Sequence, residues 1–403
     1  MNVHESVDVA PMKVARVTPY LSDRYLFVEV ETEDGLVGVG ECGAWGQLEA
    51  ARTAVEKFGD YLVGEDAGTI ELHWNRMQRF GWFRGAVVGA AISGIDIALW
   101  DIKGQALGQP VYALLGGPAR TRARAYCHVK ASSQAQMVEN CLRRKEQGFT
   151  AIGHLNPFLD EDRTIAYGKS HARKIGDAVA VIADLRDRLG NDVDLCVEIH
   201  RRLTSAEAIT FAREIAPYRP MFYEDPIAPT SADAMGRVAD KVDIPIATGE
   251  RFSTLNDFQM HLSRGALSYA RISVCLCGGI TGARKIAALC EAFDVGVIPH
   301  NPLSPVSLAA CLQLDAAIPN FVIQEFPTVG LEFESAEEDG DAAGQWLRGE
   351  QLVDEIPEVR EGYVDIPTRP GIGIALSKRG RAAPAIARGV RMRAHKDGFV
   401  VDQ

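Results

Sequence analysis

The chain has 403 residues, of which 47% are hydrophobic and 24% charged, and its 43 Lys and Arg against 54 Asp and Glu give a net charge of −11. This length and apolar content predict a large folded core in two or more domains and exclude an intrinsically disordered chain. An acidic chain without a basic patch in its body argues against a nucleic-acid partner.

No feature of a membrane or exported protein stands out in the sequence. The longest nearly apolar stretch, residues 85–100, contains Asp96 and is too short to cross a bilayer. The opening MNVHESVDVAPMK has no charged segment followed by an apolar run, so we expect no signal peptide. Eight scattered cysteines predict reduced, buried thiols and a cytoplasmic protein.

The first 120 residues combine strand and helix patterns. Residues 13–42 alternate apolar and polar side chains around the turn at 33–35, which predicts antiparallel strands joined by a tight connection. From 46 to 108 the apolar period becomes helical, and we expect the helix over 90–104 to end at Lys103-Gly104. Residues 1–120 therefore predict an α+β domain.

After residue 122 short β-rich runs alternate with amphipathic stretches, a pattern typical of parallel βα units. The predicted strands are 123–129, 149–154, 193–199, 220–225, 244–250, 269–274, 295–300 and 321–325. The last six strand ends lie 23 to 27 residues apart. This regular period favours a (β/α)8-type barrel over 121–330, with its active site at the carboxyl ends of the strands.

An open doubly wound sheet is the alternative fold for this segment, but none of these eight strands is followed by a G-x-G-x-x-G or G-x-x-x-x-G-K-S/T motif. Residues 331–403 begin with an acidic run and become turn-rich over 363–377, which predicts a return to the first domain. The final 25 residues are basic, and we expect a solvated or interface-packed tail.

Three consecutive predicted strands end in a carboxylate, at Glu198, Glu224 and Glu250. One such glutamate is commonly a salt-bridged rim residue, but three in one barrel mouth disfavour joint ionisation unless a cation is present. Oxygen ligands suit a hard divalent ion, so the trio predicts a Mg²⁺ site.

Two histidines share this mouth and are candidates for acid-base chemistry near neutral pH. His200 lies two residues after Glu198, and in an extended segment both side chains would face the same way. His300 ends the seventh strand. Glu325 ends the eighth and would either hydrogen-bond a developing anionic oxygen in its protonated form or pair with a cation. With a metal on a substrate carboxylate, these groups suit removal of the α-proton and loss of a β-hydroxyl.

These residues resemble the enolase superfamily in its mandelate racemase-like branch. The segments that carry the resemblance are ISGIDIALWDIKGQALGQPVYALLGG, YEDP, ATGER, CGGITGARKIAAL and IPHNPLSPVSLAAC. The resemblance implies a capping domain, made by residues 1–120 and the C-terminal segment, over a barrel that binds Mg²⁺ through Glu198, Glu224 and Glu250.

Within that branch EIHRRLT and IPHNPLSP resemble galactonate and mannonate dehydratases. This resemblance implies His200 as the acid that protonates the departing hydroxyl and His300 as the base that takes the α-proton. The expected activity is dehydration of an aldonate (galactonate, gluconate or mannonate) or an aldarate to a 2-keto-3-deoxy acid. Two alternatives stay open: a racemase or epimerase of a 2-hydroxy acid, and a metal-binding member with weak or no turnover.

The sequence departs from the family pattern at several positions. Glu198 stands where the family usually has aspartate, and Ser273 stands at the position of the aspartate that orients the seventh-strand histidine. The second strand lacks the paired lysines of racemases, which argues against a two-lysine mechanism. His154 ends that strand, where packing is the favoured role and the mouth the alternative.

Arg201 and Trp82 are the predicted substrate contacts. Arg201 follows His200 and would pair with a distal substrate oxygen or with a rim acid, and Trp82 lies in the predicted capping domain. The expected partner is a small sugar acid, and family resemblance implies a homo-oligomer.

Overall fold

A computed structural model describes residues 11–401, except for 83, 130, 132, 160–168, 327–348, 387–392 and 395–396. It starts with an antiparallel sheet of β1 (Val14–Ser22), β2 (Tyr25–Thr32) and β3 (Val37–Cys42). The predicted turn joins β2 to β3, with Gly35 at φ +91°. Helices α1 (Leu48–Leu62), α2 (Ile70–Arg79), α3 (Ala86–Leu107) and α4 (Val111–Leu114) follow.

Helix α3 does not end at Lys103-Gly104, so that prediction is wrong. The helix continues to Leu107 and ends at Gly108, which adopts the left-handed conformation typical of a C-cap. Gly104 is an interior residue that permits close packing, because a Cβ there would lie 2.6 Å from the Gly371 Cα. A glycine needed for a tertiary contact therefore looked like a helix end.

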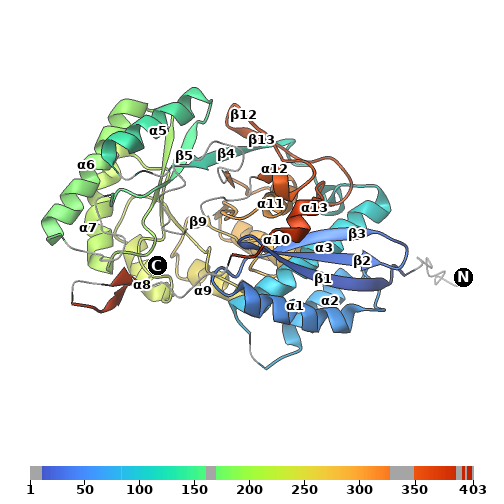
Figure 1. Cartoon of the computed structure of the whole chain (residues 1–403). Coiled ribbons are helices and arrows are strands. Elements are labelled where there is room, and N and C mark those ends of the chain that lie inside the picture. Colours follow the sequence, from blue (N-terminus) through green and yellow to red (C-terminus); the bar gives the residue numbers. More distant parts are fainter. Residues whose placement is uncertain are drawn as a thin grey trace, which may run out of the picture.

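Eight parallel strands form the second part of the molecule (Figure 1). They are β4 (Arg122–His128), β5 (Ala151–Leu155), β6 (Asp194–Glu198), β7 (Phe222–Glu224), β8 (Ile246–Thr248), β9 (Tyr269–Ala270), β10 (Gly296–Val297) and β11 (Gln324–Phe326). Neighbours pair from β4 to β10 in chain order, and β11 pairs with β4. The ring is completed where Val297 exchanges backbone hydrogen bonds with Asn320 and Val322. This is the predicted (β/α)8 barrel.

Helices connect these strands as predicted. They are α5 (Gln134–Glu146), α6 (His171–Leu189), α7 (Ser205–Ile215), α8 (Ala232–Ala239), α9 (Leu255–Ser263), α10 (Gly279–Ala292) and α11 (Pro305–Ala317). Capping boxes at Thr204 and Thr254 start α7 and α9. One cluster of buried strand residues includes Tyr126, Cys196, and Phe222. All eight cysteines are buried free thiols, as expected.

The C-terminal part contacts both the barrel and the first sheet. It comprises α12 (Gly349–Leu352), β12 (Val359–Arg360), β13 (Tyr363–Asp365), α13 (Lys378–Ala382), β14 (Arg393–Ala394) and β15 (Val400–Val401). Strand β13 pairs antiparallel with β4, while Arg381 binds Glu29 of β2. The acidic run at 332–341 lies outside the described residues, as does part of the basic tail.

Glu41 of β3 joins the first sheet to the barrel. Its buried carboxylate accepts hydrogen bonds from the Ser304 hydroxyl at 2.5 Å and the Ser307 amide at 3.2 Å, both at the start of α11. The first sheet is thereby anchored next to the loop that carries His300. Among the described residues, no helix combines the length and apolar character that a membrane span needs.

Candidate metal and acid-base site

The three predicted carboxylates meet at the carboxyl ends of adjacent strands. Glu198 ends β6, Glu224 ends β7, and Glu250 lies two residues beyond β8. One carboxylate oxygen from each lies within 4.8 Å of the others. The spacing of the strand ends predicted this convergence, because adjacent parallel strands deliver their last residues to the same mouth.

The trio carries strong mutual electrostatic effects. Burial, together with the charges of Glu224 and Glu250, raises the pKa of Glu198 well above its usual value. Burial also raises the pKa of Glu224, to about 7. Burial would raise the pKa of Glu250 too, but His300 and Arg201 beside it bring that pKa down to about 2. The raised pKa values of Glu198 and Glu224 indicate that a further positive charge at this site would favour the ionised form of all three carboxylates.

The donor set of this trio fits a hard divalent ion. All three ligand atoms are carboxylate oxygens, two of the three side chains are almost fully buried, and their separation lets a single ion reach them. Oxygen donors of this kind suit Mg²⁺ rather than a thiophilic or nitrogen-preferring metal. A glutamate at position 198 offers the same carboxylate oxygen ligands as the aspartate that is more usual there.

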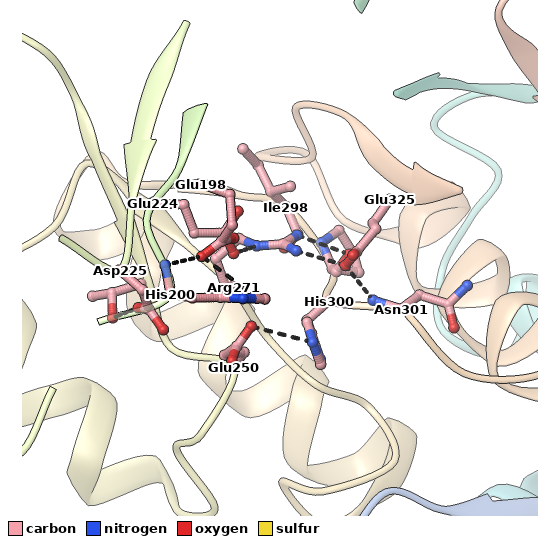
Figure 2. A network of polar contacts seen from close by, with 12 residues as sticks. Glu198, His200, Glu224, Asp225, Glu250, Arg271, Ile298, His300, Asn301 and Glu325 are labelled. Atoms are coloured by element: carbon pink, nitrogen blue, oxygen red, sulfur yellow. Dashed lines mark hydrogen bonds and ion pairs between the residues drawn. The ribbon is translucent and has the colours of Figure 1, made fainter. Parts of the chain in front are cut away.

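Arg271, which sequence reasoning did not single out, lies at the centre of the site (Figure 2). Its side chain, just after β9, is almost completely buried. It donates to the carboxylates of Glu224 and, at 2.5 Å, Glu325, and to the carbonyl oxygens of Ile298 and Pro299. The available signal was an arginine inside the predicted strand 269–274, where a charged residue needs buried partners.

Of the two alternatives for Glu325, the structure favours pairing with a cation, because its carboxylate contacts the Arg271 guanidinium. Besides its pair with Arg271, Glu325 accepts a hydrogen bond from the Asn301 backbone amide at 2.6 Å. Its other carboxylate oxygen is hydrogen-bonded with His128 Nε2, also at 2.6 Å. Burial would raise the pKa of Glu325, but Arg271 and His300 hold it well below the usual range.

Arg201 faces acids rather than open space. Its guanidinium pairs with Asp225 at 2.8 Å and with Glu250 at 2.5 Å. Of the two predicted partners of Arg201, a substrate oxygen and an acid of the protein, the structure contains the second. Asp225 also accepts a hydrogen bond from the Thr248 hydroxyl at 2.5 Å. Glu250 is therefore connected through Arg201 to a buried polar network. Trp82, by contrast, is 98% exposed, and its role as a substrate contact stays a prediction.

The two predicted acid-base histidines flank the carboxylates. The His200 amide donates to Glu198 at 2.9 Å, and its ring Nε2 lies 3.8 Å from the same carboxylate. His200 and Arg201 have φ of +51° and +64°, so a tight turn, rather than the predicted extended alternation, brings His200 back to Glu198. His300 Nε2 lies 3.4 Å from Glu250, and its buried Nδ1 has no hydrogen-bond partner among the residues that the structure describes.

Burial favours the neutral form of both imidazoles. Burial lowers the pKa of His200 to about 4, and burial also lowers the pKa of His300. A neutral imidazole accepts a proton readily, which suits His300 as a base. Ser273, at the position of the family's orienting aspartate, is buried but supplies no partner for the His300 Nδ1.

His154 faces the mouth, contrary to the favoured packing role. Its ring lies 4.6 Å, centroid to centroid, from that of His200 and 4.8 Å from that of His128. The reason is an irregularity in β5, whose pairing with β6 shifts register between Ile152 and Leu155. Such a bulge turns a side chain to the other face of a strand, which periodicity alone does not reveal.

Comparisons with known proteins agree over nearly the whole chain. Residues 1–116 match the N-terminal domain model of mandelate racemase and muconate lactonizing enzyme, and residues 136–380 match the enolase C-terminal domain-like model. A D-galactonate dehydratase of Pectobacterium atrosepticum is 35% identical, covering 91% of this chain and 93% of its own. One of Ralstonia pickettii is 34% identical, covering 97% and 100%. The structure of an enolase from Agrobacterium radiobacter, with bound sodium and L-malate, is 28% identical with a TM-score of 0.88, covering 97% and 100%.

Proposed function

The chain belongs to the mandelate racemase and muconate lactonizing enzyme family of the enolase superfamily, and from this premise we propose that it is a sugar-acid dehydratase. Support comes from the D-galactonate dehydratases that match almost its full length at about a third identity. The observation that carries the proposal is the set of three converging carboxylates flanked by His200 and His300.

We assign Glu198, Glu224 and Glu250 as the residues that would hold Mg²⁺. When bound there, the ion would supply positive charge that stabilises the negative charge developing on a substrate carboxylate. Arg271 and Arg201 keep two of these carboxylates in place from the protein side. The two proton transfers of the reaction are assigned to histidine side chains.

His300 is the proposed base. Burial lowers the pKa of His300, which favours the neutral ring, and its Nε2 lies 3.4 Å from the Glu250 carboxylate. Taking the α-proton of the sugar acid onto this nitrogen would give an imidazolium that Glu250 and Glu325 stabilise. The charges of both carboxylates already favour the protonated ring electrostatically.

His200 is the proposed acid that protonates the β-hydroxyl as it leaves as water. In the substrate-free protein its pKa is about 4, so it must gain a proton before it can act. A substrate carboxylate bound nearby would raise this pKa, since a negative charge favours the imidazolium. The net change is loss of one water and formation of a 2-keto-3-deoxy acid. Galactonate is the first substrate to test, followed by gluconate, mannonate and the aldarates.

The test is a panel of sugar acids incubated with Mg²⁺, with release of 2-keto acid as the readout. We expect release with at least one aldonate or aldarate, its loss on removing the metal, and its loss in Glu224→Gln together with weaker Mg²⁺ binding. The matched control Glu139→Gln alters an exposed glutamate on α5 and should leave both unchanged. If Glu224→Gln kept both metal binding and turnover, the proposal would be wrong.

Two other results would redirect it. Solvent deuterium entering recovered substrate without loss of water would indicate a racemase or epimerase. Mg²⁺ binding with neither keto-acid release nor α-proton exchange across the whole panel would indicate a metal-binding member without turnover.

A further inference from the structure

A second group of metal-type ligands adjoins the carboxylate trio. His154, Glu198 and His200 each offer one ligand atom, and these atoms lie within 4.8 Å of one another. Glu198 belongs to both groups, while the two histidines belong only to the second. Two imidazole nitrogens and one carboxylate oxygen form a chemically different donor set from three carboxylates.

The backbone aims both histidines at this point through two separate distortions. His154 has φ +55° within the register shift of β5, and His200 has φ +51° in the turn after β6. The left-handed conformation is uncommon for residues other than glycine and costs about 1 kcal/mol or more at each. Without the bulge, the His154 side chain would follow the strand's alternation to the opposite face.

Neighbouring groups fix the orientation of the His154 ring. The His128 ring stacks on it with centroids 4.8 Å apart and an interplanar angle of 22°. His128 is itself tied to Glu325 through Nε2 at 2.6 Å. His200 then meets His154 edge to face at 77°. Orientation of ligand rings by such outer contacts is what bound metals require of a protein.

We propose that His154, Glu198 and His200 form a second divalent-cation site that selects a transition metal such as Zn²⁺ over Mg²⁺. Two histidines with one carboxylate are a recurrent zinc ligand set, whereas Mg²⁺ prefers oxygen ligands and keeps its waters. Three protein ligands leave a coordination position open, so an ion in this site would also accept water or a substrate oxygen.

This site goes beyond the proposed dehydration and has a consequence for it. Zn²⁺ on His200 occupies the nitrogen that would protonate the leaving hydroxyl, and on Glu198 it takes a ligand from the Mg²⁺ site. Zn²⁺ would therefore inhibit a Mg²⁺-dependent dehydratase. The Zn²⁺ site itself does not depend on which sugar acid is the substrate.

The test is titration of the metal-free full-length protein with Zn²⁺ and, separately, with Mg²⁺ by isothermal calorimetry. His154→Gln should weaken Zn²⁺ binding roughly tenfold or more, with Mg²⁺ binding nearly unchanged. Glu224→Gln should do the reverse, and Glu198→Gln should weaken both. His171→Gln, at an exposed histidine of α6, is the matched control and should bind both ions like the unaltered protein.

Co²⁺ provides a readout on the unaltered chain, should a variant fail to fold. Nitrogen ligation in a site of low coordination number gives intense visible absorption, and Zn²⁺ rather than Mg²⁺ should remove it. The proposal is overturned if folded His154→Gln binds Zn²⁺ normally, if Glu224→Gln loses Zn²⁺ as fully as Mg²⁺, or if Co²⁺ gives only the weak spectrum of an all-oxygen site. Failure of keto-acid release with intact Zn²⁺ binding would reject only the dehydratase.

Discussion

Replacing Arg271 with methionine removes a buried cation that joins the carboxylate trio to the eighth strand of the barrel. The guanidinium pairs with Glu224 and Glu325 and is itself almost wholly inaccessible to solvent. Methionine fills similar volume but leaves two buried carboxylates without their shared partner. Loss of one member of a buried ion pair costs about 3–5 kcal/mol, because the charge left behind is desolvated and uncompensated.

We therefore expect Arg271→Met to lower the free energy of unfolding by about 3–5 kcal/mol and, for a chain of this length, the melting temperature by about 4–6 °C. Urea unfolding of the metal-free protein is the primary assay, because bound metal would add its own stabilisation. Arg271→Lys is the matched control: it retains the charge but has no planar fork to reach both carboxylates, so about half the loss should remain. If Arg271→Met unfolds within about 1 kcal/mol of the unaltered protein, Glu224 and Glu325 are compensated by other groups and the reasoning fails.

Three further changes test other parts of the structure. Burial raises the pKa of Glu41 to about 7, above its unfolded value, so the stabilisation from this group is complete below about pH 4.5 and is lost as the pH rises through 7. Relative to Glu41→Gln, the unaltered protein should lose about 3 kcal/mol of unfolding free energy between pH 4.5 and 8. Urea unfolding at each pH measures this difference. Ser273→Asp would give the unpartnered Nδ1 of His300 an acceptor and raise its pKa, so the acid limb of the kcat/KM profile should move to higher pH, while Ser273→Asn should leave it in place. Gly153→Ala would place a Cβ 2.1 Å from the ring of Tyr126 inside the barrel and should cost about 1–3 kcal/mol of unfolding free energy; an unchanged urea midpoint would contradict the packing seen here.

Regular spacing is what made the convergence of the three carboxylates predictable. Glu198, Glu224 and Glu250 end three consecutive parallel strands, and neighbouring strands in such a barrel are also neighbours in sequence. Knowing the period and the strand ends was therefore sufficient to place three side chains in one mouth. His300 followed by the same logic, because it lies just beyond β10 in the same ring.

The partners of those side chains were not predictable in the same way. Arg271 lies just after β9 and joins carboxylates from two other strands, so its role depends on which side chains point inward at one level of the barrel. His154 reaches the mouth only because of an added residue in β5, and Arg201 turns to Asp225 through a left-handed turn. A hydrophobic pattern does not encode either distortion.

The sequence by itself determined the order of elements, the eight-strand period, the buried free thiols and the carboxylates at the strand ends, because these depend on local periodicity and on chain-order pairing. Tertiary structure alone decided which charges neutralise one another and which histidines face the carboxylate trio. Those outcomes depend on contacts between residues distant in sequence, and a one-residue bulge is enough to move a side chain from one face of a strand to the other.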